Sequence, residues 1–315
     1  MSKAINLGYI MKVSVGSVSG GLTEGDIITA KKVTLPGGRL LPYISGQSLR
    51  YMMRRKLEES GWKLADAETR VGGAEKKYAI PPGKPEEYVD EDLLGYLEPE
   101  KQRRRTAPVR VSAAVGIFPY RGDRDLGTRS FEKITGEMKG SMFETEVYYD
   151  YFRGNILIEL DRIGRFEASE LGKKKEEGME ECSERGKRLS ALLTIFKDFW
   201  GGGKQSRLLT DLTPKFLMYA RQSRKVPIFL EALTMTPKEE IILAPIFETL
   251  RDYESIIEKV IVGIRTGVFV NEGEIRTAFE DFCQEPARLS KWGGIHSITD
   301  AIDEIIMDVE QDKTW

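Results

Sequence analysis

The spacing of apolar residues divides the chain into strand-like and helical segments. Residues 4–15 (AINLGYIMKVSV) have the length and β-branched content of a strand, and the glycine-rich stretch 16–26 is predicted to be a loop. From Ser45 the apolar positions adopt helical spacing, and Ser45 or Ser48 is available as an N-cap. The chain is therefore predicted to open with a strand, a loop and an amphipathic helix, whose apolar stripe comprises Leu49, Met52, Met53 and Leu57.

The middle of the chain is less regular. Residues 62–105 contain GlyGly, ProPro and dense charge, which predicts an inserted segment of loops and short helices. Residues 109–118 (VRVSAAVGIF) are strand-like, and residues 144–164 predict a bent strand or a hairpin around Gly154. Between them, residues 118–140 are predicted to form a long projecting loop, a feature that is usually functional or disordered.

A second helix is predicted up to the glycine run at Gly201, and a strand follows at residues 215–220 (KFLMYA). The order strand, helix, strands, helix, strand predicts an α+β fold, a modified ferredoxin-like or RRM-like palm with insertions. We expect this palm to span residues 1–230. Residues 231–315 are expected to be mainly helical, with one strand at 260–270, and to pack on the palm. The helical spacing before the glycine run is that of Leu189, Leu192, Leu193, Phe196 and Trp200.

Charge is distributed unevenly along the chain. The formal net charge is −2, but residues 231–315 carry 18 acidic and 8 basic residues, a balance of −10 that leaves +8 on residues 1–230. Eight cations lie between Lys101 and Arg129, against Asp123 and Asp125. This asymmetry indicates a polyanion-binding body beside an acidic lobe, although a solvated charged surface would also account for it.

Few residues suit catalysis or metal binding. The single histidine, His296, is interpreted as a surface or capping residue, and Cys182 and Cys283 match no metal spacing. Asp123 and Asp125 lie in a basic segment and are expected to form local ion pairs. We therefore expect no enzymatic activity, no metal and no cofactor. The N-terminal sequence and the lack of a long apolar run predict a cytoplasmic protein without a membrane span.

Two segments carry groups that suit phosphates. On the helix from Ser45, Gln47, Arg50 and Arg54 fall on one face, away from the apolar stripe, where guanidinium forks and the helix N-terminus can bind anions. An ordinary solvated helix face would have the same pattern.

The second segment is the glycine run at residues 201–207 (GGGKQSR). It combines a backbone that can approach a ligand closely with two cations, Lys204 and Arg207. The alternative is a helix that ends at Trp200 and is capped by Gly201. Both readings can hold together, with Gly201 ending the helix and residues 202–207 facing a polyanion. The sheet aromatics that stack bases in ordinary RRMs are missing from the nearest segment, FRGNILIEL (152–160), so sequence-specific base reading on the sheet is not expected.

Four blocks in this order resemble the backbone subunit of type I CRISPR Cascade complexes, the DevR-type branch of the CRISPR-associated seventh family. They are LPYISGQSLRYMMRR, RTAPVRVSAAVGIFPY, FETEVYYDYF and RLSALLTIFKDFWGGGKQSRLLTDLTPKFLMYA, and the resemblance covers residues 4–222. It implies an RRM-like palm with inserted fingers, here residues 62–105, and a thumb, here residues 118–140. Copies of such a subunit form a helical filament along the CRISPR RNA (crRNA).

The resemblance also implies roles for individual residues. The helix and the glycine-rich loop would touch the RNA backbone, and the thumb would hook over the guide of a neighbouring copy, with Tyr120, Phe131 and Ile134 as candidates for its wedge. The candidate RNA-binding residues are Ser45, Gly46, Gln47, Ser48, Arg50, Arg54, Arg110, Arg121, Gly202, Gly203, Lys204, Gln205, Ser206 and Arg207.

The function implied is a noncatalytic antiviral subunit that presents the guide for pairing with target DNA. Its partners would be crRNA, target DNA, copies of itself, a guide-end subunit, a large subunit and a guide-processing nuclease. One alternative is a type III-like subunit that cuts target RNA with an aspartate after the first strand. Ungapped counting places that aspartate at Ala30, and Asp26 lies nearby. Another alternative is a transcriptional regulator, although no helix-turn-helix is evident.

Overall fold

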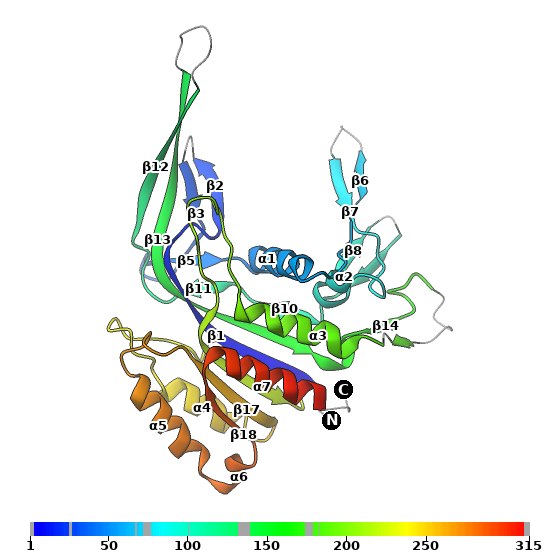
Figure 1. Ribbon diagram of the computed structural model, residues 1–315, viewed down its shortest axis with the longest axis vertical. Coiled ribbons are helices and arrows are strands. Elements are labelled where there is room, and N and C mark those ends of the chain that lie inside the picture. Colours follow the sequence, from blue (N-terminus) through cyan, green and yellow to red (C-terminus); the bar gives the residue numbers. More distant parts are fainter. Residues whose placement is uncertain are drawn as a thin grey trace.

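A mixed sheet with helices on its faces dominates the molecule (Figure 1). The structure is a computed structural model, which describes residues 3–24, 27–66, 68–71, 77–99, 101–131, 139–173, 179–181 and 183–311. The fold is α+β, as predicted.

The long strand β1 (Ala4–Gly16) lies in the middle of the sheet. It pairs antiparallel with β13 (Lys139–Glu159) on one side and with β16 (Pro214–Gln222) on the other. The strand order is β18-β17-β16-β1-β13-β11-β5-β4, with β3, β10 and β12 also paired to β13. The outer strands are β3 (Ile27–Ala30), β4 (Lys32–Thr34), β5 (Leu40–Ile44), β10 (Val109–Val111), β11 (Ala114–Gly116), β17 (Ile257–Ile264) and β18 (Trp292–His296).

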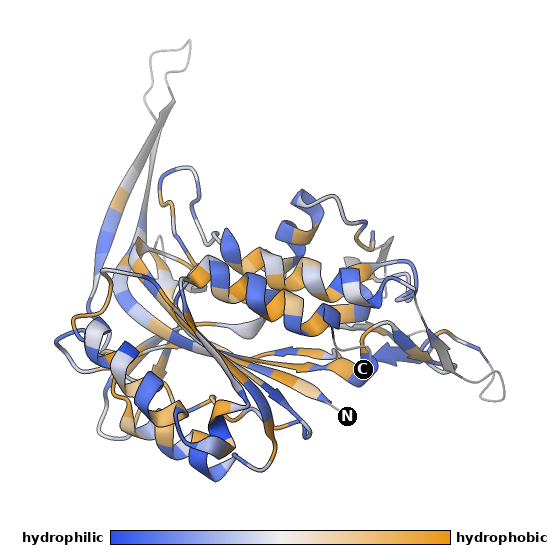
Figure 2. Cartoon of the chain, turned by 60° about the horizontal axis from the view of Figure 1, so that its bottom comes forward, coloured by the Kyte–Doolittle hydropathy of each residue, from blue (hydrophilic) through white to orange (hydrophobic). Residues whose placement is uncertain are grey.

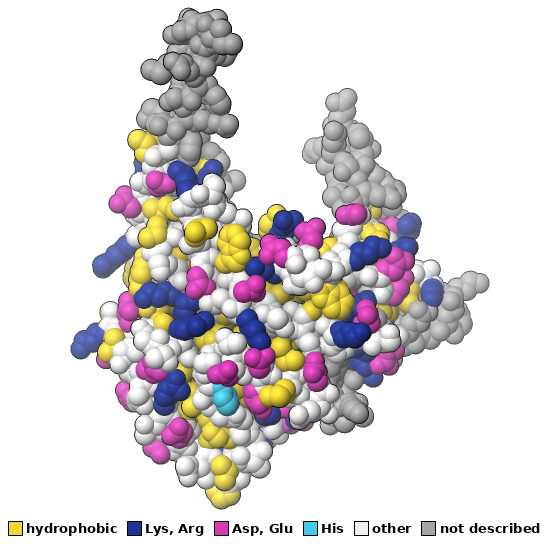
Figure 3. Space-filling view, viewed as in Figure 1, with side chains coloured by type: hydrophobic (Ala, Val, Ile, Leu, Met, Phe, Trp, Pro, Cys, Tyr) yellow, Lys and Arg dark blue, Asp and Glu magenta, His cyan; other side chains and the backbone are white. Residues whose placement is uncertain are grey.

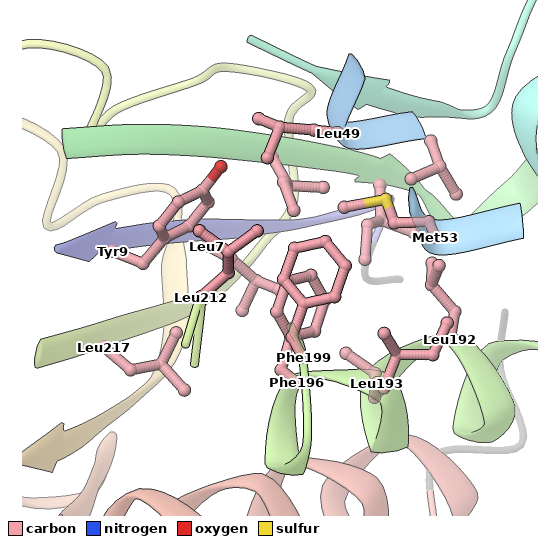
Figure 4. Close-up of a cluster of buried hydrophobic side chains, with 14 of the residues drawn as sticks. Leu7, Tyr9, Leu49, Met53, Leu192, Leu193, Phe196, Phe199, Leu212 and Leu217 are labelled. Carbon is pink, nitrogen blue, oxygen red and sulfur yellow. The ribbon is translucent and has the colours of Figure 1, made fainter. Parts of the chain in front are cut away.

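Both faces of β1 are buried, because alternate side chains enter two different cores. Leu7 and Tyr9 face a core shared with α1 (Gly46–Glu59), α3 (Arg185–Thr194) and α7 (Ile298–Gln311), shown in Figure 4. Ile10 faces a second core with α4 (Ala244–Asp252) and α5 (Glu272–Cys283). Each large side chain that is fully buried in this way stabilises the fold by about 1.5–3 kcal/mol. Helices therefore cover the sheet on both sides, with their apolar positions turned inward (Figure 2).

The predicted strand 4–15 and the helix from Ser45 are confirmed as β1 and α1. The second helix ends earlier than predicted. α3 passes into the 3-10 turn η4 (Ile195–Lys197), whereas Trp200 lies in an isolated β-bridge with Asp211. The amide of Gly201 donates to the carbonyl oxygen of Thr210 at 3.2 Å. The prediction that the helix reaches Trp200 and is capped by Gly201 is therefore wrong, because strand-like pairing takes over after Lys197.

Residues 118–140 do not form the predicted loop. Within the described residues, β12 (Gly122–Phe131) pairs antiparallel with the first half of β13, and this hairpin extends away from the body in the same direction as β6–β7 (Figure 1). Nor does β13 turn at Gly154. This residue lies opposite Tyr9, and a Cβ there would be 2.3 Å from the Tyr9 hydroxyl oxygen, so its role is to make room for the ring.

Two further predicted segments differ from expectation. Part of the stretch predicted as a glycine-rich loop, 16–26, forms β2 (Gly20–Glu24), which pairs with β3. The strand predicted at 109–118 is divided into β10 and β11. The start of α1 explains the division, because a Cβ on Gly46 would lie 2.5 Å from the carbonyl oxygen of Val111.

The predicted finger segment, 62–105, is tied to the palm through one buried carboxylate. The segment holds β6 (Glu68–Val71), β7 (Lys77–Ile80), α2 (Val89–Leu94), β8 (Tyr96–Glu98) and β9 (Arg103–Arg105). Asp92 on α2 forms ion pairs with Arg105 at 2.7 Å and with Arg188 of α3 at 2.8 Å, and it accepts a hydrogen bond from the amide of Gly164. All three charged side chains are buried, and Arg105 also pairs with Glu170 at 2.7 Å. This network joins α2, β9 and α3.

The region 231–315 continues the sheet of the palm instead of forming a separate layer. β17 pairs antiparallel with β16, and β18 pairs in parallel with β17. The strand predicted at 260–270 is thus β17, and the sequence pattern missed β18. The helices of this region are α4, α5, α6 (Pro286–Leu289) and α7. The remaining strands, β14 (Arg165–Glu167) and β15 (Met179–Glu181), form a small ribbon. None of the described helices has the length and apolar character needed to cross a membrane.

Replacing Asp92 with alanine is expected to lower the free energy of unfolding by about 3–5 kcal/mol, because the buried Arg188 loses its counter-charge and Arg105 keeps only Glu170. Urea unfolding followed by circular dichroism measures the change. The control is Glu58→Ala, which removes the exposed partner of Arg55 and is expected to cost less than about 1 kcal/mol. Equal effects of the two substitutions would contradict the structural role of Asp92.

A second buried carboxylate, Asp150, lies where the chain enters the β12–β13 hairpin. Its Oδ1 accepts hydrogen bonds from the amides of Phe118 at 3.2 Å and Tyr151 at 2.7 Å, whereas Oδ2 is buried without a partner among the described residues. Burial raises the pKa of the Asp150 carboxyl to about 7, and the amide hydrogen bonds only partly oppose this. The folded protein therefore favours the protonated acid more than the unfolded chain does.

Stability is accordingly expected to fall as the pH rises from about 4 to 7 and to level off above 7. The Asp150→Asn protein should lack this pH-dependent contribution to stability. Its free energy of unfolding relative to wild type should therefore rise by about 2–4 kcal/mol across that range, since one pKa unit corresponds to about 1.4 kcal/mol. Urea unfolding at pH 4.5 and pH 8 measures the difference. A difference that stays constant with pH would rule out titration of this group.

Candidate nucleic-acid interface

The N-terminus of α1 presents polar groups at the surface. Ser45 caps the helix, because its Oγ accepts a hydrogen bond from the amide of Ser48 at 3.3 Å. The ammonium group of Lys31 lies 3.5 Å from the same Oγ, and Gln47 is exposed beside it. A cation next to the N-terminus of a 14-residue helix favours anionic ligands. The helix buries its predicted apolar stripe, so its outer face is the polar one.

Arg50 and Arg54 line a cleft between α1 and the finger segment. The cleft has a volume of about 660 Å³, and its other walls include Gln47, Asp90 and Tyr96. Arg54 forms an ion pair with Asp90 at 3.1 Å, and the guanidinium of Arg50 donates to the carbonyl oxygen of Leu94. These contacts hold both guanidinium groups at the wall of the cleft.

The cleft brings two arginines close together, and Asp90 and Glu91 line it as well. Burial lowers the pKa of Arg50, and the nearby charge of Arg54 lowers it further. Nε of Arg50 is buried and has no hydrogen-bond partner among the described residues. Two neighbouring cations in a partly dehydrated cleft would both be stabilised by a bound phosphate.

The glycine run packs closely against the segment that follows β1. The amide of Gly203 donates to the carbonyl oxygen of Ser17 at 2.9 Å, and a Cβ on Gly203 would lie 2.7 Å from that oxygen. Gly202 has φ of +111°, and Lys204 also has a positive φ, +57°. The backbone therefore needs glycine at positions 202 and 203. This geometry carries Lys204, Gln205 and Ser206 to the surface.

The glycine run and α1 also touch each other. A Cβ on Gly201 would lie 2.6 Å from Sδ of Met52, so only glycine allows this approach to the helix. Further along the run, Arg207 forms an ion pair with Asp125 at 2.9 Å and donates to Oγ1 of Thr145 at 3.2 Å. Through Arg207 the run, residues 201–207, is linked to both strands of the β12–β13 hairpin. Thus α1, the glycine run and the hairpin form one connected surface.

The foot of the hairpin carries a polar cluster. Glu146 accepts hydrogen bonds from Nζ of Lys32 at 2.7 Å and from the amide of Ala30 at 2.8 Å. Burial would raise the pKa of Glu146, but these hydrogen bonds outweigh it and hold the pKa below its usual value. Lys32 also lies 4.4 Å from the ring centroid of Tyr120. This arrangement neutralises the carboxylate nearest to Ala30.

The three wedge candidates fall in different places. Tyr120 lies at the foot of the hairpin, half-buried against Tyr148, and not at the far end where a wedge would be needed. Phe131 is the last residue of β12, opposite Lys139. Ile134 lies outside the described residues. A wedge role for Phe131 or Ile134 therefore remains a prediction.

Other predicted residues do not join this surface. Val109 and Val111 face the core that contains α1, so the alternation of β10 turns Arg110 to the opposite face of the sheet, where it pairs with Glu159. Arg121 is exposed just before β12. Asp26 lies outside the described residues. His296 is half-buried, with Nε2 2.8 Å from the carbonyl oxygen of Gly293.

The sequence reasoning missed Lys31, Lys32 and the carbonyl group of Ser17. A signal was present for the lysines, because the LysLys pair lies at the start of β4, upstream of the SGQSLR block. Lys and Arg side chains alternate with Asp and Glu over the face that carries α1 and α3 (Figure 3). Charge composition alone therefore does not locate the site, whereas the contacts between elements do.

Gly203→Ala is expected to destabilise the protein by about 1–3 kcal/mol, because the new methyl group must push the loop away from the backbone of Ser17. Thermal unfolding measures the effect. The control is Gly186→Ala on α3, where nothing lies within 4 Å of the new Cβ and helix propensity predicts a gain of up to about 1 kcal/mol. An unchanged melting temperature for Gly203→Ala would show that the loop does not require this close approach.

The chain is similar to known proteins in sequence and in fold. Residues 13–253, more than half of the chain, match the family model described as "CRISPR-associated negative auto-regulator DevR/Csa2". No curated protein matches the sequence.

Solved structures share the fold. A chain of a "CRISPR RNA-guided surveillance complex, pre-nicking" has a TM-score of 0.53 and 13% sequence identity, with 97% of this chain and 100% of that chain covered. A chain of a "CRISPR RNA-guided surveillance complex" has the same TM-score and identity, with 97% of this chain and 99% of that chain covered. At this identity the likeness concerns the fold.

Proposed function

We propose, from the premise that this chain belongs to the CRISPR-associated DevR/Csa2 family, that it is a noncatalytic backbone subunit of a type I Cascade complex. In this role copies of the chain line up along crRNA, hold it through its backbone and present its bases to target DNA. The observation that carries the proposal is the contact of Gly201 with Met52, which packs the two predicted RNA-binding segments directly against each other beneath the surface.

The topology supports a ferredoxin-like palm. The central strands follow the order β16-β1-β13-β11, and the neighbouring pairs are antiparallel. In chain order these are the fourth, first, third and second strands of the βαββαβ unit, whose helices are α1 and α3. The finger segment and the β12–β13 hairpin are then insertions into this unit, and the hairpin is suited to reach a neighbouring copy as the thumb.

The groups on the surface support sequence-independent binding. They are the N-terminus of α1, Lys31, the two arginines of the cleft and the exposed side chains at the tip of the glycine run, all of which suit phosphate and sugar. An RRM uses the face of its sheet to stack bases. Here β1 is buried on both faces, so the sheet is not available for that mode. Specificity would then reside in the guide.

A noncatalytic role is favoured by the surroundings of Ala30. The position that corresponds to the aspartate of RNA-cleaving relatives is occupied by alanine, and the nearest carboxylate described, Glu146, is paired with Lys32. The proposed partners are crRNA, target DNA, further copies of the chain, a guide-end subunit, a large subunit and a guide-processing nuclease. The acidic region 231–315 is proposed to contribute to subunit contacts or to limit nonspecific binding.

The double substitution Arg50→Ala/Arg54→Ala is expected to weaken binding to random single-stranded RNA about tenfold at low salt, because two cations are removed from the cleft. The slope of log affinity against log salt should become shallower by roughly 1.4, at about 0.7 per lost phosphate contact. Fluorescence anisotropy over a salt series measures both quantities.

The matched control is Arg55→Ala, which removes an arginine of the same helix that pairs only with the exposed Glu58 among the described residues. It should leave affinity and slope nearly unchanged. Tight, sequence-selective binding to duplex DNA would instead favour the regulator. Cleavage of bound RNA with magnesium, abolished by Asp26→Ala, would favour the RNA-cleaving alternative.

A further inference from the structure

Two exposed apolar side chains flank the base of the glycine run. Trp200 is 41% exposed and Leu209 is 80% exposed, although both belong to a segment that is otherwise fixed by backbone hydrogen bonds. They line a cavity of about 480 Å³ together with Phe199, Thr213 and Arg265. Exposing an indole and an isobutyl group side by side is unfavourable in water, which suggests that a ligand covers them.

The pairing of the two legs of the loop determines where these side chains point. Trp200 is bridged to Asp211, and the amide of Gly201 donates to Thr210. Gly201 and Thr210 are buried, so they face inward. The alternation of extended backbone then puts Trp200 and Leu209 on the outer side of the same loop that carries Lys204 and Arg207.

The indole is held in place before any ligand arrives. Nζ of Lys56 lies 5.6 Å from the ring centroid of Trp200, and Lys56 is itself fixed by ion pairs with Glu59 at 3.1 Å and with Asp198 at 3.4 Å. Asp211 is paired with Lys215 at 2.6 Å. The acids around the cavity are therefore neutralised. Arg265 lines the cavity and forms no ion pair within the part of the chain described.

We infer that Trp200 and Leu209 form a stacking platform for one base of the bound single strand. This inference rests on the proposed function. An aromatic face beside a cationic backbone-binding loop is the combination with which proteins hold single-stranded nucleic acid without reading its sequence. The cavity of about 480 Å³ lies in the size range of pockets that bind small ring-containing groups, and it has room for a base. Arg265 is placed to meet the phosphate of the stacked nucleotide.

Binding of random single-stranded RNA by Trp200→Ala, Trp200→Phe and wild-type protein tests the inference. Loss of stacking is expected to weaken binding about tenfold in Trp200→Ala, while Trp200→Phe should stay within about threefold of wild type. An abasic oligomer of the same length should bind all three proteins equally. The control is Leu289→Ala, which removes another exposed apolar side chain, on α6, and should have no effect.

Fluorescence provides a second readout that does not depend on an alanine variant. Stacked bases quench indole emission, so RNA with bases should quench wild-type fluorescence more than the abasic oligomer does. Trp200→Phe should lose this difference.

If Trp200→Ala binds RNA as tightly as wild type while Arg50→Ala/Arg54→Ala binds weakly, the stacking platform is overturned and the proposed function stands. If neither variant weakens binding, the proposed function fails as well. If Trp200→Ala alters only the size of the assemblies, the platform is a protein contact and the inference is wrong.

Discussion

The buried carboxylate of Asp92 is the constraint on which the arrangement of the proposed RNA-binding surface depends. It is shared by an arginine of the inserted segment and an arginine of α3, and it also accepts the amide of Gly164. A buried charge of this kind is tolerated only when every partner is in place. Because α2 is held there, its neighbour Asp90 meets Arg54 and the carbonyl of Leu94 meets Arg50. The shape of the cleft along α1 thus depends on the buried ion pairs of Asp92.

A second constraint is the double burial of β1. Its two faces belong to two cores, so the palm and the acidic C-terminal region share one sheet and do not meet as separate bodies. This explains why the polar chemistry lies on loops and on the start of a helix, since both faces of the central sheet are covered. The close contacts of glycines with Met52, Ser17 and Tyr9 then set how near the loops and strands approach one another.

Local sequence patterns predicted those helices and strands whose signals lie within a few residues of one another in the chain. The N-cap Ser45, the apolar stripe of α1 and the first strand could be read directly, because each depends on its own sequence neighbours. The hairpin of β12 and β13 could not, since Asp123 and Val147 pair although they are far apart in sequence and no short hairpin signal lies between them. The local sequence cannot show why residue 154 is glycine, because the ring of Tyr9 that requires it is far away in sequence. The orientation of Arg110 likewise depends on which face of the sheet α1 covers.

The strand order also has a consequence for self-association. Among the described residues its two ends are short strands, β4 with three residues and β18 with five, two of them glycine. Such edges offer few free amide and carbonyl groups, which disfavours the open-ended growth of one sheet into the next that leads to aggregation. The long, apolar strand β16 would be a far more aggregation-prone edge, but β17 pairs with it. At these two ends a chain proposed to assemble in many copies is thereby protected from joining sheet to sheet, whereas the longer edge strand β12 belongs to the projecting hairpin.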